Sequence, residues 1–156
     1  TMSGIYTVQF NAVAVTAAQD LFEIVAGSAK PIVLIGFGVS QYTDVGDAAE
    51  ELLSILVKSG QSTSGSGGSS VTPAATDASG SAASFTCEAN NTTKASTGTI
   101  LTHYAYAWNV RGPMEIVLPE PMQLIMPASR RMTIELVGAP ADSLTMNGYA
   151  VVQEIG

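Results

Sequence analysis

The sequence predicts an all-β protein: a single jelly-roll-like antiparallel β-sandwich that carries one long Gly/Ser-rich loop. Short segments of alternating or wholly apolar residues recur along the chain, as is typical of strands. Turns rich in Gly, Pro, Asn and Asp separate about eight to ten of these segments, which favours a sandwich or barrel. The 156 residues fit one domain with a sizeable core. We therefore expect one domain over residues 1–156.

The N-terminal segment predicts a strand with an irregularity. Apolar and polar residues alternate over Ile5–Asn11, which indicates a strand with one buried face. The large residues then change phase to Val13 and Val15, so we expect a bulge or tight turn near Asn11–Ala12. Further strands are predicted at 20–26, 83–89, 132–137 and 147–155.

The segment Pro31–Ser40 (PIVLIGFGVS) is apolar on both faces and predicts a central strand. Gly36 and Gly38 fall on one face, together with Ile32 and Leu34. Paired glycines indicate either that another backbone passes close by or that a curved sheet bends locally. Residues 43–58 then predict an acidic loop that opens into a strand.

Residues 59–84 include fourteen Gly or Ser residues and one charged residue, Asp77. Such a stretch buries too little apolar surface to offset the entropy lost on ordering. We expect a long loop within the domain. It is either disordered or a surface arm that reaches over a neighbouring subunit.

The segment Thr99–Val110 predicts a strand with one bulky face and one face of mostly small residues. The bulky face holds Ile100, Thr102, Tyr104, Tyr106, Trp108 and Val110. These aromatic residues fill the sandwich core or form a subunit interface, with the core as the default. Next, Pro113–Pro119 and Pro121–Pro127 both fit P-M-x-[IL]-[VI]-[LM]-P, which predicts two short edge strands bounded by prolines.

The composition indicates a soluble protein that buries part of its surface against other chains. Hydrophobic residues make up 46% and charged residues 12%, about half the usual share of charge. No apolar run reaches the roughly 20 residues of a membrane-spanning helix, and no secretory signal pattern starts the chain. The net charge of −7 and the scattered basic residues argue against nucleic acid and membranes as partners.

No catalytic, cofactor or metal site is predicted, so we expect no enzyme. His103, the single histidine, lies mid-strand, and no Ser–His–Asp arrangement is recognisable around it. Cys87 is expected to be a small buried hydrophobic residue. The carboxylates of Asp44, Asp47, Glu50 and Glu51 lack the spacing of a calcium loop, and Glu115 and Glu120 carry no glycosidase signature.

Three segments resemble a group of small virion proteins of tailed bacteriophages. They are AVAVTAAQDLFEIVAG (12–27), EANNTT (88–93) and APADSLTMNGYAVVQEIG (139–156). The ending Leu144–Ile155 is also similar to the closing strand of trimeric jelly rolls of the tumour-necrosis-factor type, in which a small residue, here Gly148 or Ala150, lies in the last core strand.

The resemblance implies a capsid decoration (cement) protein. Such a protein binds the outer face of the phage head, bridges major capsid protein subunits, and is found in the virion and, during assembly, in the host cytoplasm. A homo-oligomer, with a trimer first, is the expected state. The residues expected at its interfaces are Tyr104, Tyr106, Trp108, Met114, Met122, Arg130 and Arg131. Two alternatives stay open: a receptor-binding or carbohydrate-binding adhesion module, and another minor head or tail component.

Overall fold

The computed structural model describes residues 4–42 and 51–156, and these residues are almost entirely β-structure. A single turn of 3-10 helix, η1 (Glu120–Met122), is the one helical element of the described part. The strands are β1 (Ile5–Val15), β2 (Gln19–Val25), β3 (Ile32–Gln41), β4 (Leu52–Thr63), β5 (Ser69–Val71), β6 (Ala74–Ala75), β7 (Thr86–Asn91), β8 (Ser96–Asn109), β9 (Met114–Val117), β10 (Leu124–Met126), β11 (Arg131–Leu136) and β12 (Leu144–Glu154). The all-β prediction is confirmed.

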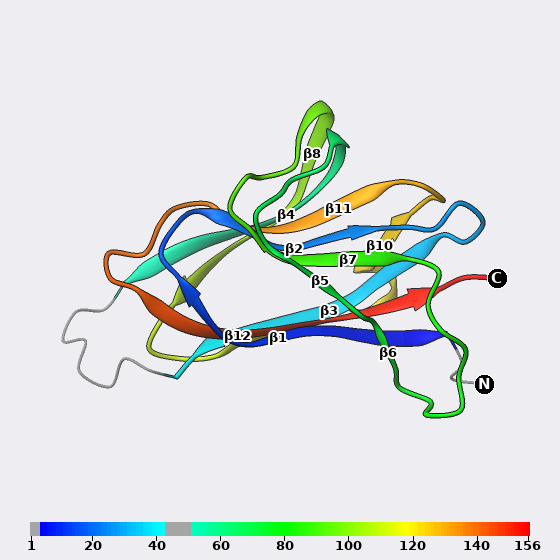
Figure 1. The fold of residues 1–156 in the computed structure, drawn as a ribbon, viewed down its shortest axis with the longest axis horizontal. Coiled ribbons are helices and arrows are strands. Elements are labelled where there is room, and N and C mark those ends of the chain that lie inside the picture. The colour runs from blue at the N-terminus through cyan, green and yellow to red at the C-terminus, as the bar shows by residue number, and fades with distance from the viewer. Residues whose placement is uncertain (1–3, 43–50) are drawn as a thin grey trace.

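Two antiparallel sheets pack face to face (Figure 1). Sheet A has the order β10-β3-β12-β1-β6, with β9 also paired to β3, and sheet B has the order β5-β7-β2-β11-β4-β8. The first strand pairs with the last, β1 with β12, and β2 pairs with the next to last, β11. This nesting of late strands against early ones is jelly-roll-like, as predicted.

The core lies between the inner faces of the two sheets. Phe10 of β1 and Phe22 of β2 bridge the sheets, with ring centroids 5.3 Å apart. The closing strand β12 alternates strictly between buried and half-buried residues, the pattern of a strand with one face on the core. Gly148 lies on its buried face, where a Cβ atom would come 2.5 Å from Phe10 Cε1. A small residue is therefore required at this position of the last strand.

Two irregularities set which residues face the core. The predicted bulge in β1 is confirmed: the register shifts between Phe10 and Val13, and Ala12 adopts a positive φ of 58°. A second register shift, in the β3–β12 pairing, places Ile35 outside the ladder. Because of this shift, Phe37 rather than Gly36 faces the core together with Leu34. The prediction that Gly36 and Gly38 share a face with Ile32 and Leu34 was therefore wrong.

The two proline-bounded segments form successive short edge strands on β3. β9 pairs with its second half and β10 with its first half, and η1 separates them. A Cβ atom at Gly36 would lie 2.5 Å from the carbonyl oxygen of Ile116 in β9. At Gly36, the prediction that another backbone passes close by is thereby confirmed.

The segment 59–84 differs from the predicted long loop. β4 continues through it to Thr63, and β5 and β6 pair with β7 and β1. Its C-terminal end is fixed by Glu154, whose carboxylate accepts hydrogen bonds from the backbone N–H groups of Ser84 and Phe85 at 3.0 and 3.2 Å. Backbone pairing and this buried carboxylate supply the order that side-chain composition does not predict.

Candidate assembly interface

The edge strand β8 is the longest strand of the molecule and the least protected edge of either sheet. Among the described residues it has one pairing partner, β4. Its sequence STGTILTHYAYAWN contains no Lys, Arg, Asp, Glu or Pro, the residues that usually prevent an edge from pairing with other chains. The other edge strands have only two to four residues each. The β8 edge is therefore the place where this fold can accept another chain.

A bulge at His103 divides β8 into two halves. Tyr104 pairs with Val57 and Thr102 with Lys58, so His103 has no partner in the register. Its Nε2 atom lies 2.6 Å from the Ser59 hydroxyl. On the N-terminal side of the bulge, all residues from 96 to 103 are exposed. We call this half, together with residues 58–63 of β4, the arm; Figure 1 shows it projecting from the sandwich.

The C-terminal half of β8 closes one side of the core. Trp108 is 1% exposed, and its indole N–H donates to the Gly112 carbonyl at 2.7 Å. Tyr106 packs edge-on against Phe37 of the opposite sheet, with ring centroids 5.5 Å apart. The Tyr104 hydroxyl donates to the carbonyl of Met122, which ties β8 to η1. Both tyrosines are half-buried at the margin of the core.

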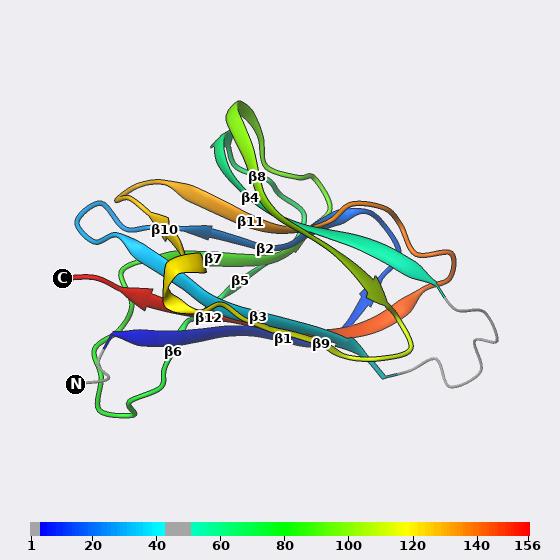
Figure 2. The ribbon, with the colours of Figure 1, turned by 180° about the vertical axis from the view of Figure 1, so that it is seen from behind.

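Five exposed apolar side chains belong to β8, β9, η1 and β10, and Figure 2 shows these four elements with η1 toward the viewer. We call them the apolar flank: Ile100, Leu101, Val117, Met122 and Ile125. Val117 is 78% exposed and Leu101 is 56% exposed. Exposed apolar side chains on and near an unpaired strand edge are typical of a protein–protein interface.

The base of the arm is anchored to sheet B by buried carboxylates. Glu23, 2% exposed, accepts hydrogen bonds from the Ser64 hydroxyl at 2.7 Å and from the Gly65 N–H at 2.8 Å. Glu23 also accepts a hydrogen bond from the side-chain amide of Asn91 at 3.5 Å and forms an ion pair with Arg131, whose Nε lies 3.2 Å away. Because this charge is both paired and hydrogen-bonded, its burial is tolerated.

Two further carboxylates complete this anchor. Glu135 forms ion pairs with Lys58 at 2.9 Å and Lys94 at 2.6 Å, and these lysines hold its pKa below the usual value despite partial burial. Asp20 accepts one hydrogen bond from the Ala95 N–H at 2.8 Å. Burial is the main reason that the pKa of Asp20 rises to about 6. The arm is thus positioned by polar contacts at its base rather than by a hydrophobic core.

The residues predicted for the interface fall into three groups. Tyr104, Tyr106 and Met114 are half-buried and pack against the core, and Met122 is exposed within the flank. Trp108 lies in the core, and Arg131 is engaged with Glu23 and with the Gln61 carbonyl at 2.8 Å, so neither is free for a partner. Arg130 is exposed. The other four residues of the flank, Ile100, Leu101, Val117 and Ile125, were not among the predicted ones because their exposure follows from strand order, although the uncharged run 96–109 was visible in the sequence.

The candidate chemical residues lie apart from one another. Cys87 is 3% exposed, and burial raises the pKa of its thiol well above the usual value. Glu51 Oε1 accepts a hydrogen bond from the Ala141 N–H at 2.7 Å, whereas Asp44, Asp47 and Glu50 lie outside the described residues. Within the described ranges no group of three or more His, Cys, Asp or Glu side chains could hold a metal ion.

Comparisons with known proteins give no relative: no family model, no curated protein and no solved structure matches this chain. In the described part of the chain, no helix has the length and apolar character needed to cross a membrane.

Proposed function

We propose that this chain is a non-enzymatic structural protein that works by assembling with other chains, as a decoration protein on the head of a tailed bacteriophage. The observation that carries the assembly role is the β8 edge: fourteen uncharged residues at an unpaired sheet margin beside the apolar flank. The phage assignment is supported by the sequence resemblance of segments 12–27, 88–93 and 139–156.

Removal of exposed apolar side chains from water supplies free energy for assembly. Apolar side chains contribute about 25 cal/mol for each Å² removed from water, and the flank offers five exposed apolar side chains on β8, β9, η1 and β10. An unpaired strand edge also offers backbone N–H and C=O groups that a partner strand can pair. Burying both in an assembly accounts for the low share of charged residues in the chain.

The first experiment is to measure the molar mass in solution by sedimentation and then to mix the protein with empty phage heads. We expect a homo-oligomer, with a trimer first, that co-sediments with heads in fixed stoichiometry. A chain of 16.0 kDa that stays monomeric and ignores the heads would overturn the proposal.

A matched pair of variants locates the interface. Leu101→Lys places a charge in the arm, and Ile155→Lys does the same at an exposed apolar residue outside the flank, at the end of the last strand. We expect the first variant to dissociate the oligomer or release it from heads, and the second to behave as the parent protein. Equal behaviour of the two would remove the flank as the interface.

A further inference from the structure

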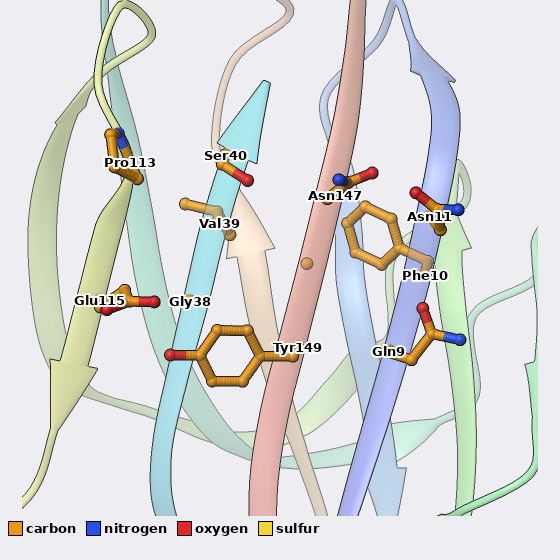
Figure 3. Close-up of a pocket in the computed structure, with 11 residues that line it drawn as sticks. Gln9, Phe10, Asn11, Gly38, Val39, Ser40, Pro113, Glu115, Asn147 and Tyr149 are labelled. Carbon is orange, nitrogen blue, oxygen red and sulfur yellow. The ribbon is translucent and has the colours of Figure 1, made fainter. Parts of the chain in front are cut away.

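A groove of about 360 Å³ crosses the outer face of sheet A, on the side of that sheet away from the core (Figure 3). Strands β1, β12, β3 and β9 lie side by side beneath it, so its floor is rigid backbone rather than loop. The volume falls within the roughly 300–1,000 Å³ of small-molecule sites, near the lower end of that range.

An aromatic ring forms the apolar floor of this groove. Tyr149 of β12 is paired with Gly38 of β3, and a Cβ atom at Gly38 would overlap the Tyr149 ring. The far edge of the ring therefore occupies space over Gly38 that only glycine leaves open. Figure 3 shows the ring extending from β12 to β3, with its hydroxyl toward Glu115. Its upper face is presented to the groove.

Polar groups that can hydrogen-bond surround the ring. The side chains of Gln9 and Asn11 are exposed, and each lines the groove. Asn147 accepts a hydrogen bond from the Ala12 N–H at 2.8 Å through Oδ1, which orients its amide and leaves the NH₂ group free to donate. The bulge at Ala12 thus positions a donor in the groove.

The carboxylate of Glu115 provides the opposite rim. It hydrogen-bonds to the Tyr149 hydroxyl, and burial first and this carboxylate second raise the pKa of that tyrosine. The phenol therefore stays neutral at neutral pH. Among the residues that the structure describes, no lysine or arginine lines the groove, so an anionic ligand meets no counter-charge from them.

We propose that this groove binds a neutral saccharide through stacking on Tyr149 and hydrogen bonds to Gln9, Asn11, Asn147 and Glu115. A pyranose ring has an apolar C–H face, and the electron-rich face of an aromatic ring attracts such hydrogens. Hydroxyl groups at the ring margin both donate and accept, which matches a rim of amides and one carboxylate. An entirely apolar ligand would leave these groups desolvated without partners.

The test is a glycan array that holds neutral, sialylated and sulfated saccharides, followed by calorimetric titration with the neutral saccharide retained best. We expect retention of neutral glycans only. Tyr149→Ala removes the stacking surface and should lower the affinity by at least about tenfold, whereas Gln9→Ala, which deletes a single hydrogen-bonding group, should lower it about fivefold.

Two controls separate binding from folding. Thr7→Ala alters β1, the strand that also carries Gln9, at a position outside the groove. It should leave the affinity for the saccharide unchanged. Tyr149→Phe keeps the ring and should retain the larger part of the affinity, and thermal unfolding confirms that each variant is folded. Absence of neutral glycan binding, preference for sulfated or sialylated glycans, or equal binding by the Tyr149→Ala variant would each overturn the proposal.

Discussion

The two halves of β8 belong to one continuous strand, yet they are stabilised by different interactions. The C-terminal half places Trp108 in the core and Tyr106 against Phe37 of the facing sheet. The N-terminal half is exposed on every residue from 96 to 103 and depends on β4 and on the carboxylates below it. The strand passes from one environment to the other at the bulge of His103.

The difference separates what stabilises the fold from what is free to bind. Burial of large side chains supplies the main stabilising free energy of a domain, and the C-terminal half of β8 contributes to it. The arm buries little, so its exposed apolar residues can be changed, or covered by a partner, with little effect on the domain. This division yields four predictions, each of which tests it.

The largest effect is expected for Trp108→Ala. Removing a buried tryptophan and its hydrogen bond to Gly112 leaves a cavity and should lower the free energy of unfolding by about 3–5 kcal/mol. Leu101→Ala, in the arm, should change it by no more than about 0.5 kcal/mol. Urea denaturation of both variants measures the contrast. Similar losses for the two would mean that the arm is part of the core.

Arg131→Met should have the next largest effect. The change keeps the aliphatic stem but leaves the Glu23 carboxylate, 2% exposed, without its cation. Breaking a buried ion pair in this way costs about 3 kcal/mol. The neighbouring exposed residue gives the control, because Arg130→Met should change the free energy of unfolding by less than about 0.5 kcal/mol. Chemical denaturation at pH 7 distinguishes them, and equal effects would contradict the anchoring role of Glu23.

Asp20 gives a pH-dependent test. Its folded pKa of about 6 exceeds the ordinary aspartate value of 3.8, so between pH 6 and 4 the folded state binds a proton that the unfolded state does not. The folded state therefore becomes more stable relative to the unfolded state as the pH falls from 6 to 4. Above pH 6 the buried charge of Asp20 lowers the free energy of unfolding. Asp20→Asn should raise the free energy of unfolding by about 2 kcal/mol at pH 8, with the gain vanishing near pH 4.

Measurement of unfolding from pH 8 to pH 4 checks this prediction. Glu135 has a lowered pKa, so its stabilising contribution is lost only at lower pH, below its unfolded value. A gain for Asp20→Asn that is constant over the whole range would show that Asp20 is not protonated in the folded state near pH 6.

The smallest effect on global stability is expected for Gly60→Ala, within the arm. Gly60 has a φ of +93°, and a Cβ atom would overlap the carbonyl oxygen of Thr99. We expect faster amide hydrogen exchange in the arm and a change of less than about 1 kcal/mol in global unfolding. Uniformly faster exchange across both sheets would mean that arm and sandwich unfold as one unit.

Much of the fold could be predicted because alternation of apolar and polar residues reports which strand face is buried. The bulge at Ala12 was visible as a phase change between Phe10 and Val13. The bulge at Ile35 was hidden, because β3 is apolar on both faces and a phase change leaves no trace there.

The candidate sites were harder to predict because they depend on which strands become neighbours. Nothing local indicates that Tyr149 covers Gly38, since 111 positions separate them in the chain. The order within residues 59–84 has the same origin: distant partners such as Glu154 provide the hydrogen bonds. That residues 59–84 reach over a neighbouring subunit stays a prediction; the arm described here consists of residues 58–63 of β4 and 96–103 of β8.

The strands that the structure describes leave one long free edge, β8, and this limits the symmetry of any assembly. If two copies join β8 to β8, the contact is two-fold and both edges are used up, so growth stops at a pair. A three-fold assembly has an odd number of edges, and each edge must then meet a different surface of its neighbour. The number of copies found in solution therefore also reports what kind of surface covers β8.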